Sequence, residues 1–213
     1  MNMEVTRVYL IRHGQVEGHE EFRYNGHSDV DVTGIGRAQM SRLAGFLSGH
    51  AIGAVYSSDL KRALNGARII ARSLGLEEAG LSSLRELHLG RWEGLTKEEA
   101  VERYPEDKHF SFRSLAKGKL TGGESLDELR ERVLPALNGI IKRHRGGHVC
   151  IVAHGGVNRV ILCEAMGLPL ENFFRIEQDY GCLNLIDYLR DSTAIVKMLN
   201  GGPNQELSAA KIY

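Results

Sequence analysis

The segment Val8-Tyr9-Leu10-Ile11 runs directly into Arg12-His13-Gly14, and this junction points to both the fold class and the location of a site. Four apolar residues with branched and aromatic side chains are typical of a strand buried in a parallel sheet. The run stops at a cation, an imidazole and a glycine. Ligands in open α/β sheets bind at the carboxyl ends of strands, so a site is expected here.

A second strand ends in the same way. Residues 149–153, Val-Cys-Ile-Val-Ala, are followed by His154-Gly155-Gly156. The carboxyl ends of parallel strands meet at one edge of a sheet. Two histidines, each followed by glycine, are therefore expected to share one anion pocket built from distant parts of the chain.

The rest of the chain alternates strand and helix patterns, which predicts an α/β fold: a three-layer α/β/α sandwich around a mainly parallel sheet. Further strands are expected at 52–56, 82–84, 182–188 and 194–199. A first helix is expected to begin after an N-cap at Thr33, and a second to run from Ser58 or Asp59 to about residue 74. Further helices are expected over 96–104, from Glu124 or Ser125 to about 145, and from the residues after 156 to 166. We expect one domain over residues 1–200, with a short cap insertion at 95–123 that is mobile from 106, and a flexible tail at 201–213.

Composition argues against several classes of function. Lysine plus arginine total 27, as do aspartate plus glutamate, so no net charge draws the chain toward nucleic acid or a membrane surface. No apolar run is long enough to span a bilayer, and the first residues lack the apolar core of a signal peptide, so a cytoplasmic protein is expected. Cys150, Cys163 and Cys182 lie in apolar segments, which favours reduced core thiols over a disulfide framework.

Side chains at the predicted strand ends suit phosphoryl transfer. Arg12 and Arg62 offer planar forks of donors that match phosphate oxygens, and the neutral imidazole of His13 is a competent nucleophile toward phosphorus. His154 is placed to donate to the same oxygens, and Glu86 to act as general acid for the leaving oxygen. Each residue alone is more often structural, and it is their shared location that favours catalysis. A two-histidine metal site is disfavoured because two arginines accompany it and further ligands do not.

Several segments resemble the histidine phosphatase superfamily, the phosphoglycerate-mutase-like fold. They are residues 10–15 (Leu-Ile-Arg-His-Gly-Gln), 56–63 (Tyr-Ser-Ser-Asp-Leu-Lys-Arg-Ala), 84–87, 90–94, 123–125 and 152–156 (Val-Ala-His-Gly-Gly). The resemblance spans roughly residues 7–187. It implies that His13 is phosphorylated on a ring nitrogen and that Arg12, Arg62 and His154 hold the phosphoryl oxygens. It also implies that Glu86 protonates the leaving group and then activates water, with no metal and no cofactor.

Two positions depart from the pattern of that family. The family commonly has a phosphate-binding asparagine six residues after the nucleophile, where this chain has His19, and a threonine where this chain has Val16. A histidine at this position is a hydrogen-bond donor whose state depends on pH. These departures bear on the substrate class more than on catalysis.

The short, mixed-charge insertion favours a phosphomonoesterase, because phosphoglycerate mutases of this fold resemble a longer version. Residues 90–94 and 104–105 are similar to α-ribazole phosphatases of the cobalamin pathway and to broad-specificity bacterial relatives, so α-ribazole 5′-phosphate is a candidate substrate. The expected partner is a small phosphorylated metabolite, and a homodimer is compatible with the sequence. The residues expected to bind substrate are His19, Arg23, Tyr24, His27 and Gly155.

Two other functions stay open at this point. A mutase would return the phosphoryl group to a reoriented intermediate, and would show itself by isomerising its substrate without releasing phosphate. A non-catalytic phosphate-binding module would keep the pocket without turnover. The presence of both His13 and Glu86 argues against the second.

Overall fold

Within the residues that the structure describes (4–110, 114–115 and 118–203), a computed structural model shows one six-stranded sheet in the order β3-β2-β4-β1-β5-β6. The strands are β1 (Thr6–Arg12), β2 (Ile52–Ser58), β3 (Glu78–Leu81), β4 (His148–Ala153), β5 (Leu183–Tyr188) and β6 (Ala194–Gly201). The first four in spatial order run parallel, whereas β5 is antiparallel to β1 and β6 to β5. The sheet is therefore mixed, with a parallel majority as predicted.

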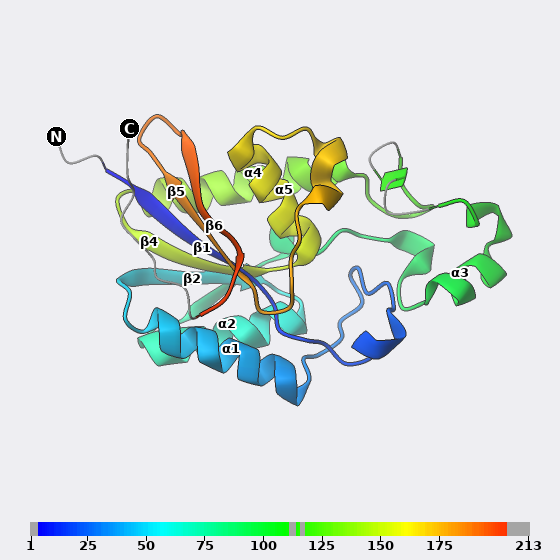
Figure 1. Cartoon of the computed structure of the whole chain (residues 1–213), viewed down its shortest axis with the longest axis horizontal. Coiled ribbons are helices and arrows are strands. Elements are labelled where there is room, and N and C mark those ends of the chain that lie inside the picture. Colours follow the sequence, from blue (N-terminus) through cyan, green and yellow to red (C-terminus); the bar gives the residue numbers. More distant parts are fainter. Residues whose placement is uncertain (1–3, 111–113, 116–117, 204–213) are drawn as a thin grey trace.

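The central pair β1 and β4 brings the two histidine-terminated strands together. They pair in parallel, and the register places Arg12 opposite Ala153. His13 and His154 therefore leave the same edge of the sheet at the same level. Figure 1 shows the two strands side by side, although they come from opposite ends of the chain.

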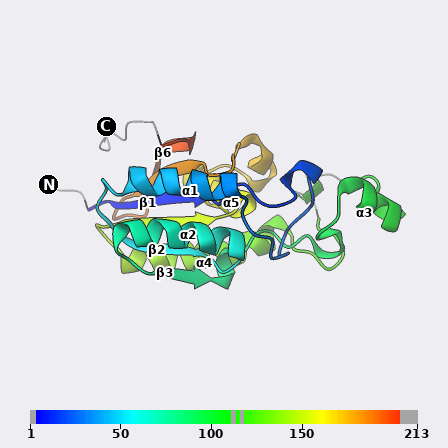
Figure 2. The same cartoon turned by 90° about the horizontal axis from the view of Figure 1, so that it is seen from below.

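Helices cover both faces of the sheet. They are α1 (Gly34–Leu47), α2 (Lys61–Leu74), α3 (Lys97–Arg103), α4 (Leu126–Arg143) and α5 (Gly155–Met166). Helices α1 and α2 lie along one face and α4 and α5 along the other (Figure 1), and Figure 2 shows α1 and α2 running side by side. The three-layer α/β/α sandwich is thus confirmed, while α3 lies apart from the sheet.

The alternation of side chains in β1 explains the two cores. Val8 and Leu10 belong to the apolar cluster formed with α4 and α5, whereas Tyr9 and Ile11 belong to the cluster formed with α1 and α2. All four side chains are fully buried. Successive residues of a strand point to opposite faces, so a strand covered on both faces must be apolar throughout.

Two helix starts are as predicted and one is not. Thr33 caps α1 by accepting from the N–H of Gly36, and Ser125 forms a capping box with Glu128 at α4. The prediction of Ser58 or Asp59 as the cap of α2 is wrong. The carboxylate of Asp59 pairs with Arg85, and the cap position is Leu60. Asp29, from a distant loop, accepts from the N–H of Lys61 instead.

The third strand also lies elsewhere than predicted. Residues 82–84 form a short 3-10 helix, and the strand is β3, Glu78–Leu81. It pairs with β2 on one side only and ends the sheet. An edge strand that is half exposed needs no continuous apolar run, so its sequence, Glu-Ala-Gly-Leu, carried no strong strand pattern.

The described part of the insertion is anchored to the rest of the chain. Leu115 and Leu120 are buried in the larger apolar cluster. Asp107 accepts hydrogen bonds from Nε of Arg91 and from the indole N–H of Trp92. The stretch that was predicted to be mobile is therefore anchored at these residues, and positions 111–113 and 116–117 lie outside the described residues.

The predicted tail begins one residue too early, because Gly201 belongs to β6. Residues 204–213 of the tail lie outside the described residues.

The three cysteines are free and buried, as predicted. Burial raises the pKa of Cys150 to about 12 and that of Cys182 to about 11. Protonated thiols of this kind are poor nucleophiles. No described helix has both the length and the apolar character that a bilayer span requires.

A glycine contact fixes the loop that follows β1. A Cβ on Gly14 would clash with the backbone of Gly36 in α1, and a Cβ on Gly36 would clash with the carbonyl oxygen of Gln15. Only two glycines allow the loop and the helix to approach this closely. The contact sets the position of His13, which lies between β1 and this loop.

We expect Gly36→Ala to lower the free energy of unfolding by at least about 1–3 kcal/mol, because the new methyl group must displace backbone. Urea denaturation of the purified protein measures this. Gly34→Ala is the matched control, since a Cβ there meets nothing within 4 Å in the same helix. The control should be neutral or stabilising by up to about 1 kcal/mol. Equal effects of the two substitutions would contradict the close-approach argument.

Candidate active site

His13 has one ring nitrogen engaged and the other directed to the site. Its Nδ1 lies 2.8 Å from the carbonyl oxygen of Gly14. A carbonyl oxygen only accepts, so Nδ1 carries the proton and Nε2 holds the lone pair. The side chain is almost fully buried, with 4% of the residue exposed. The result is a neutral imidazole whose Nε2 is available for nucleophilic attack.

His154 lies against His13. The ring centroids are 5.1 Å apart with an interplanar angle of 65°. His154 is completely buried, and neither of its ring nitrogens has a hydrogen-bond partner among the described residues. Unpartnered buried nitrogens are costly, so this imidazole is held ready to donate to a group that enters the site.

Both imidazoles are kept uncharged. Burial lowers the pKa of His13 well below its ordinary value, and the charges of Arg62 and Arg12 lower it further, while the bond to Gly14 raises it. Burial likewise lowers the pKa of His154, with further lowering by Arg62, His13 and Arg12. A protonated imidazole would be both desolvated and repelled by the two arginines.

Backbone carbonyls hold the two arginines. Arg62 is 2% exposed, and its guanidinium donates to the carbonyl oxygens of Ser28 at 2.7 Å and Gly26 at 2.6 Å. Arg12 donates to the carbonyl oxygen of Gln178, and its guanidinium carbon lies 4.1 Å from the ring centroid of Tyr180. Neutral acceptors fix the side chains without cancelling their charge, so a positive field is left for an anion.

Glu86 reaches the same place from the other side. Its carboxylate accepts from the backbone N–H of Gly156, with Oε1 at 3.0 Å and Oε2 at 3.1 Å, and from that of Leu87 at 2.8 Å. Gly156 lies in the first turn of α5, where unpaired N–H groups attract an anion. A Cβ on Gly156 would clash with Oε1 of Glu86, which explains the second glycine after His154.

The main chain of Glu86 is held by groups that do not line the cavity. Arg132 of α4 donates to the carbonyl oxygens of Ser83, Arg85 and Glu86. The same guanidinium pairs with both carboxylate oxygens of Glu124. His27 adds a hydrogen bond of 2.8 Å from Nε2 to the carbonyl oxygen of Glu86. The position of Glu86 is thus fixed through its backbone.

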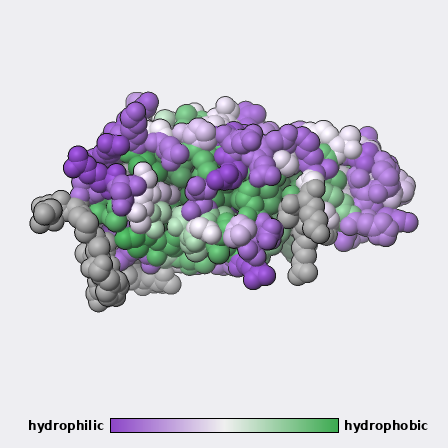
Figure 3. Space-filling model, turned by 90° about the horizontal axis from the view of Figure 1, so that it is seen from above, coloured by the Kyte–Doolittle hydropathy of each residue, from purple (hydrophilic) through white to green (hydrophobic). Residues whose placement is uncertain are grey.

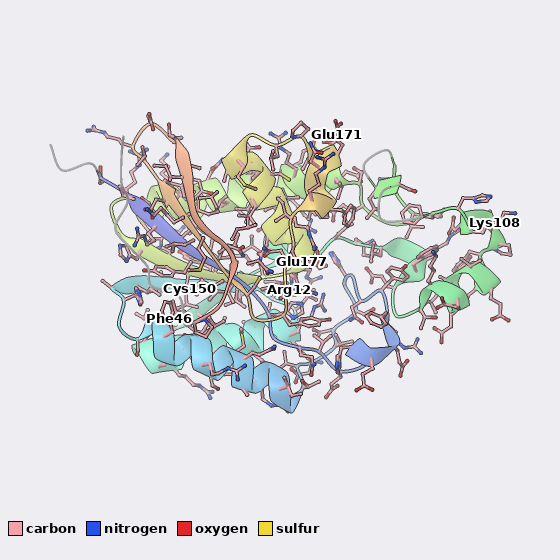
Figure 4. All side chains as sticks on the ribbon, in the orientation of Figure 1. Arg12, Phe46, Lys108, Cys150, Glu171 and Glu177 are labelled. Carbon is pink, nitrogen blue, oxygen red and sulfur yellow. The ribbon has the colours of Figure 1, made fainter. Side chains whose placement is uncertain are left out.

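Arg12, His13, Arg62 and Glu86 line one cavity of about 330 Å³. His154 packs against His13 and is not itself in the lining. Figure 4 labels Arg12 near the middle of the molecule, and Figure 3 shows apolar surface over the middle of one face and a mainly hydrophilic α3 end. Among the described residues, no group of three or more His, Cys, Asp or Glu side chains is placed to hold a metal ion. The cavity is lined by Arg12, His13, Val16, Arg23, Tyr24, Asn25, Gly26, Arg62, Glu86, Leu87, Leu89, Leu115, Gly155, Gly156, Arg159, Phe173, Phe174 and Tyr180.

Comparison with known proteins identifies the family. The model of the histidine phosphatase superfamily (branch 1) matches residues 8–201. The chain belongs to this superfamily. It is 41% identical over 161 residues to phosphoglycerate mutase-like protein 4 of Arabidopsis thaliana, covering 74% of this chain and 70% of that protein. It is 31% identical over 194 residues to phosphoserine phosphatase 1 of Hydrogenobacter thermophilus, covering 91% and 92%.

Solved structures agree with this membership. The α-ribazole phosphatase from Shigella flexneri superposes with a TM-score of 0.84 at 26% identity, covering 92% of this chain and 96% of that one. Three mycobacterial relatives at 34% identity are longer, and the chain spans about half (54%) of their length. Membership and the named phosphatase relatives make this chain a phosphatase of the histidine phosphatase type.

The structure separates the predicted substrate-binding residues of this phosphatase. Arg23, Tyr24 and Gly155 line the cavity. His19 lines a neighbouring hollow that shares Arg23, Tyr24, Asn25 and Tyr180 with the cavity, and it is absent from the lining of the cavity itself. His27 also lies outside the lining, because its ring is engaged with the backbone of Glu86 and packs against His88.

Sequence reasoning missed several lining residues, among them Arg159, Asn25 and Tyr180. Arg159 lies four residues after Gly155, one helical turn along α5, and this spacing is a signal that could have revealed it. Asn25 and Tyr180 lie on loops, and their positions depend on tertiary folding. Glu93, the next carboxylate along the chain after Glu86, is absent from the lining. Its Oε1 accepts from the N–H groups of His27 and Leu89.

The depressed pKa values predict how stability depends on pH. Between the native pKa values of His13 and His154 and the ordinary value of 6.5, the unfolded chain binds protons that the native protein does not. The free energy of unfolding should therefore fall as the pH drops below about 6.5, by up to about 1.4 kcal/mol per pH unit for each histidine. Urea denaturation between about pH 7.5 and 5.5 measures it.

Other histidines also have lowered pKa values, so the comparison must be with a variant. The double variant His13→Gln with His154→Gln should show a shallower pH dependence than the wild type. The same slope in both proteins would mean that these two imidazoles are not held neutral by burial.

Proposed function

We propose that this phosphatase is a metal-independent phosphomonoesterase that hydrolyses a small phosphorylated metabolite through a phosphohistidine on His13. The observation that carries the proposal is the state of His13: Nδ1 is bound to the Gly14 carbonyl, which leaves Nε2 free beside two arginines. The same cavity holds the carboxylate of Glu86.

In the first half-reaction, Nε2 of His13 attacks phosphorus. An N–P bond forms while the P–O bond to the leaving group breaks, and the leaving oxygen takes a proton through Glu86. Arg12, Arg62 and His154 donate to the phosphoryl oxygens while the negative charge on those oxygens redistributes in the transition state. The phosphorylated imidazole is cationic, and the hydrogen bond from Nδ1 to Gly14 stabilises that charge.

In the second half-reaction, Glu86 accepts a proton from water as the water oxygen attacks phosphorus. The N–P bond breaks, inorganic phosphate is released, and His13 returns to its neutral form. One carboxyl group thus serves as acid and then as base, and the N–H of Gly156 stabilises the carboxylate form that accepts the proton from water.

Residues 90–94 and 104–105, which carry the resemblance to α-ribazole phosphatases, are not the residues that can select the substrate. α-Ribazole 5′-phosphate stays a candidate, supported by the structural likeness to α-ribazole phosphatase. However, Arg91 and Trp92 bind Asp107, and the guanidinium carbon of Arg91 lies 4.4 Å from the ring centroid of Tyr104. These residues hold the insertion together and do not line the cavity, so the lining must set the specificity.

We expect phosphate release from a panel of phosphomonoesters in the presence of EDTA. The panel contains α-ribazole 5′-phosphate, 3-phosphoglycerate and a chromogenic aryl phosphate. Rapid quenching should trap a phosphoryl group on the peptide that contains His13, and His13→Ala should abolish both turnover and labelling. Circular dichroism of the variant checks that it is folded.

Three results would contradict the proposal. Turnover by His13→Ala would exclude the phosphohistidine. Loss of activity in EDTA that is restored by added metal would exclude the metal-free route. Isomerised phosphoglycerate that depends on a bisphosphate primer, without release of phosphate, would indicate a mutase.

Glu86→Gln should lower kcat by roughly two to four orders of magnitude, the usual scale for the loss of a general acid or base. Glu93→Gln is the matched control, because glutamine keeps the acceptor oxygen that binds His27 and Leu89. Steady-state kinetics on the aryl phosphate compares the two. A larger loss in the Glu93 variant would mean that the acid has been misassigned.

A further inference from the structure

Two buried amide side chains lie behind Arg12, and the phosphoryl chemistry does not use them. Gln178 is 1% exposed, and Asn184 of β5 is fully buried. Their amides form a reciprocal pair. Nε2 of Gln178 donates to Oδ1 of Asn184 at 2.8 Å, and Nδ2 of Asn184 donates to Oε1 of Gln178 at 2.9 Å. This amide pair ties the chain at residue 178 to the sheet.

Further hydrogen bonds complete the amide pair. Nδ2 of Asn184 also donates to the carbonyl oxygen of Leu10 in β1, and its Oδ1 also accepts from the N–H of Asn200 in β6. Nε2 of Gln178 also donates to the carbonyl oxygen of Glu177. Every amide N–H of the pair therefore has an acceptor. A buried polar network that is satisfied in this way rigidifies the structure around it.

The segment that this pair holds makes two contacts with the guanidinium of Arg12. The carbonyl oxygen of Gln178 accepts from Nη1 of Arg12. Two residues further on, the ring of Tyr180 packs on the same guanidinium, with 4.1 Å between the ring centroid and the guanidinium carbon. Figure 4 labels Arg12 beside Glu177, the residue before Gln178. The position of Arg12 therefore depends on the position of this segment.

The contact on Nη1 decides which edge of Arg12 faces an anion. Arginine commonly binds phosphate through two parallel N–H groups, and Nε with Nη2 form the edge that does not include Nη1. Nε is buried without a hydrogen-bond partner in the described part of the chain. It lies 3.6 Å from the position that a Cβ on Gly155 would take, and Gly155 lines the cavity. An unpaired buried donor is costly, so this edge is held for a ligand.

We propose that Gln178 is a positioning residue for phosphoryl binding: through its pair with Asn184, it holds the Nε–Nη2 edge of Arg12 toward the cavity. The inference rests on the phosphatase function proposed above and adds to it a residue that touches no substrate. Gln178 is absent from the cavity lining, and only its carbonyl oxygen contacts Arg12. Its side chain acts through the main chain, as Arg132 does on Glu86.

The test is a double-mutant cycle on the affinity for inorganic phosphate. Gln178→Met removes the amide and keeps the length of the side chain, whereas Arg12→Lys keeps the charge and removes the fork. Calorimetry measures Kd in the wild type, the two single variants and the double variant. Gln178→Met alone should raise Kd roughly 5- to 50-fold. In the Arg12→Lys background it should raise Kd less than about threefold, because no guanidinium edge is left to position.

Gln39→Met is the matched control. Gln39 packs against the same segment, since a Cβ on Gly181 would lie 3.0 Å from its side chain, but its Oε1 accepts from the N–H of Gln15. The substitution removes the same kind of amide without breaking the pair. Its effect on Kd should be the same factor in the wild type and in the Arg12→Lys background. A dependence on Arg12 as large as that of Gln178→Met would indicate general loosening and would overturn the proposal.

A second variant guards against a folding defect, because the loss of a buried hydrogen-bond partner also lowers stability. Circular dichroism and urea denaturation check each protein. If Gln178→Met does not fold, Asn184→Ser decides, since its shorter side chain breaks the amide pair from the other side. Asn184→Ser should show the same dependence on Arg12. An equal factor in both backgrounds would mean that the pair contributes to stability alone and would reject the positioning role.

The outcomes separate this proposal from the phosphatase function. If the wild type hydrolyses esters but the effects of Gln178→Met and Arg12→Lys on Kd simply multiply, the role of Gln178 is overturned and the phosphatase stands. If no ester is hydrolysed but the two substitutions are coupled in Kd, the positioning role is supported and the phosphatase function fails.

Discussion

The site depends on burying two uncharged imidazoles beside two guanidiniums. Desolvation and the positive field act in the same direction on His13 and His154, so both stay neutral without a carboxylate partner. Carbonyl oxygens hold the arginines in position and leave their charge, while Nε of Arg12 has no hydrogen-bond partner among the described residues. A phosphoryl group bound there would carry negative charge beside the guanidiniums and would accept a hydrogen bond from His154, whose ring nitrogens have no partner among the described residues.

The parallel sheet brings the two histidines together. Strands β1 and β4 end at the same level, so each delivers a histidine without a long loop. Three glycines then permit two close approaches: Gly14 and Gly36 let the loop after His13 meet α1, and Gly156 lets the carboxylate of Glu86 approach α5. Side chains at any of these positions would push apart groups that must share one cavity.

Much of this site could be predicted from the sequence, because strand ends carry a local signal. His13, Arg12 and His154 follow or end apolar runs, and the capping residues Thr33 and Ser125 mark their helices. What could not be predicted depends on contacts between distant segments. Asp29 accepts from the first turn of α2 from a loop distant in sequence, and Tyr180 packs on Arg12 from another distant loop. The edge strand β3 lacked an apolar run, and His27 turns to the backbone instead of the cavity.

The support of Glu86 has a consequence for how such a protein can diverge. Arg132 and His27 hold Glu86 through its main chain, Glu124 pairs with Arg132, and the cavity wall is left to other residues. Leu115, Phe173 and Arg159 can therefore be exchanged without moving Glu86. Proteins that evolve from this chain can therefore keep the reaction while their substrate changes. The residues that hold Glu86 in place are separate from the residues that line the rest of the cavity.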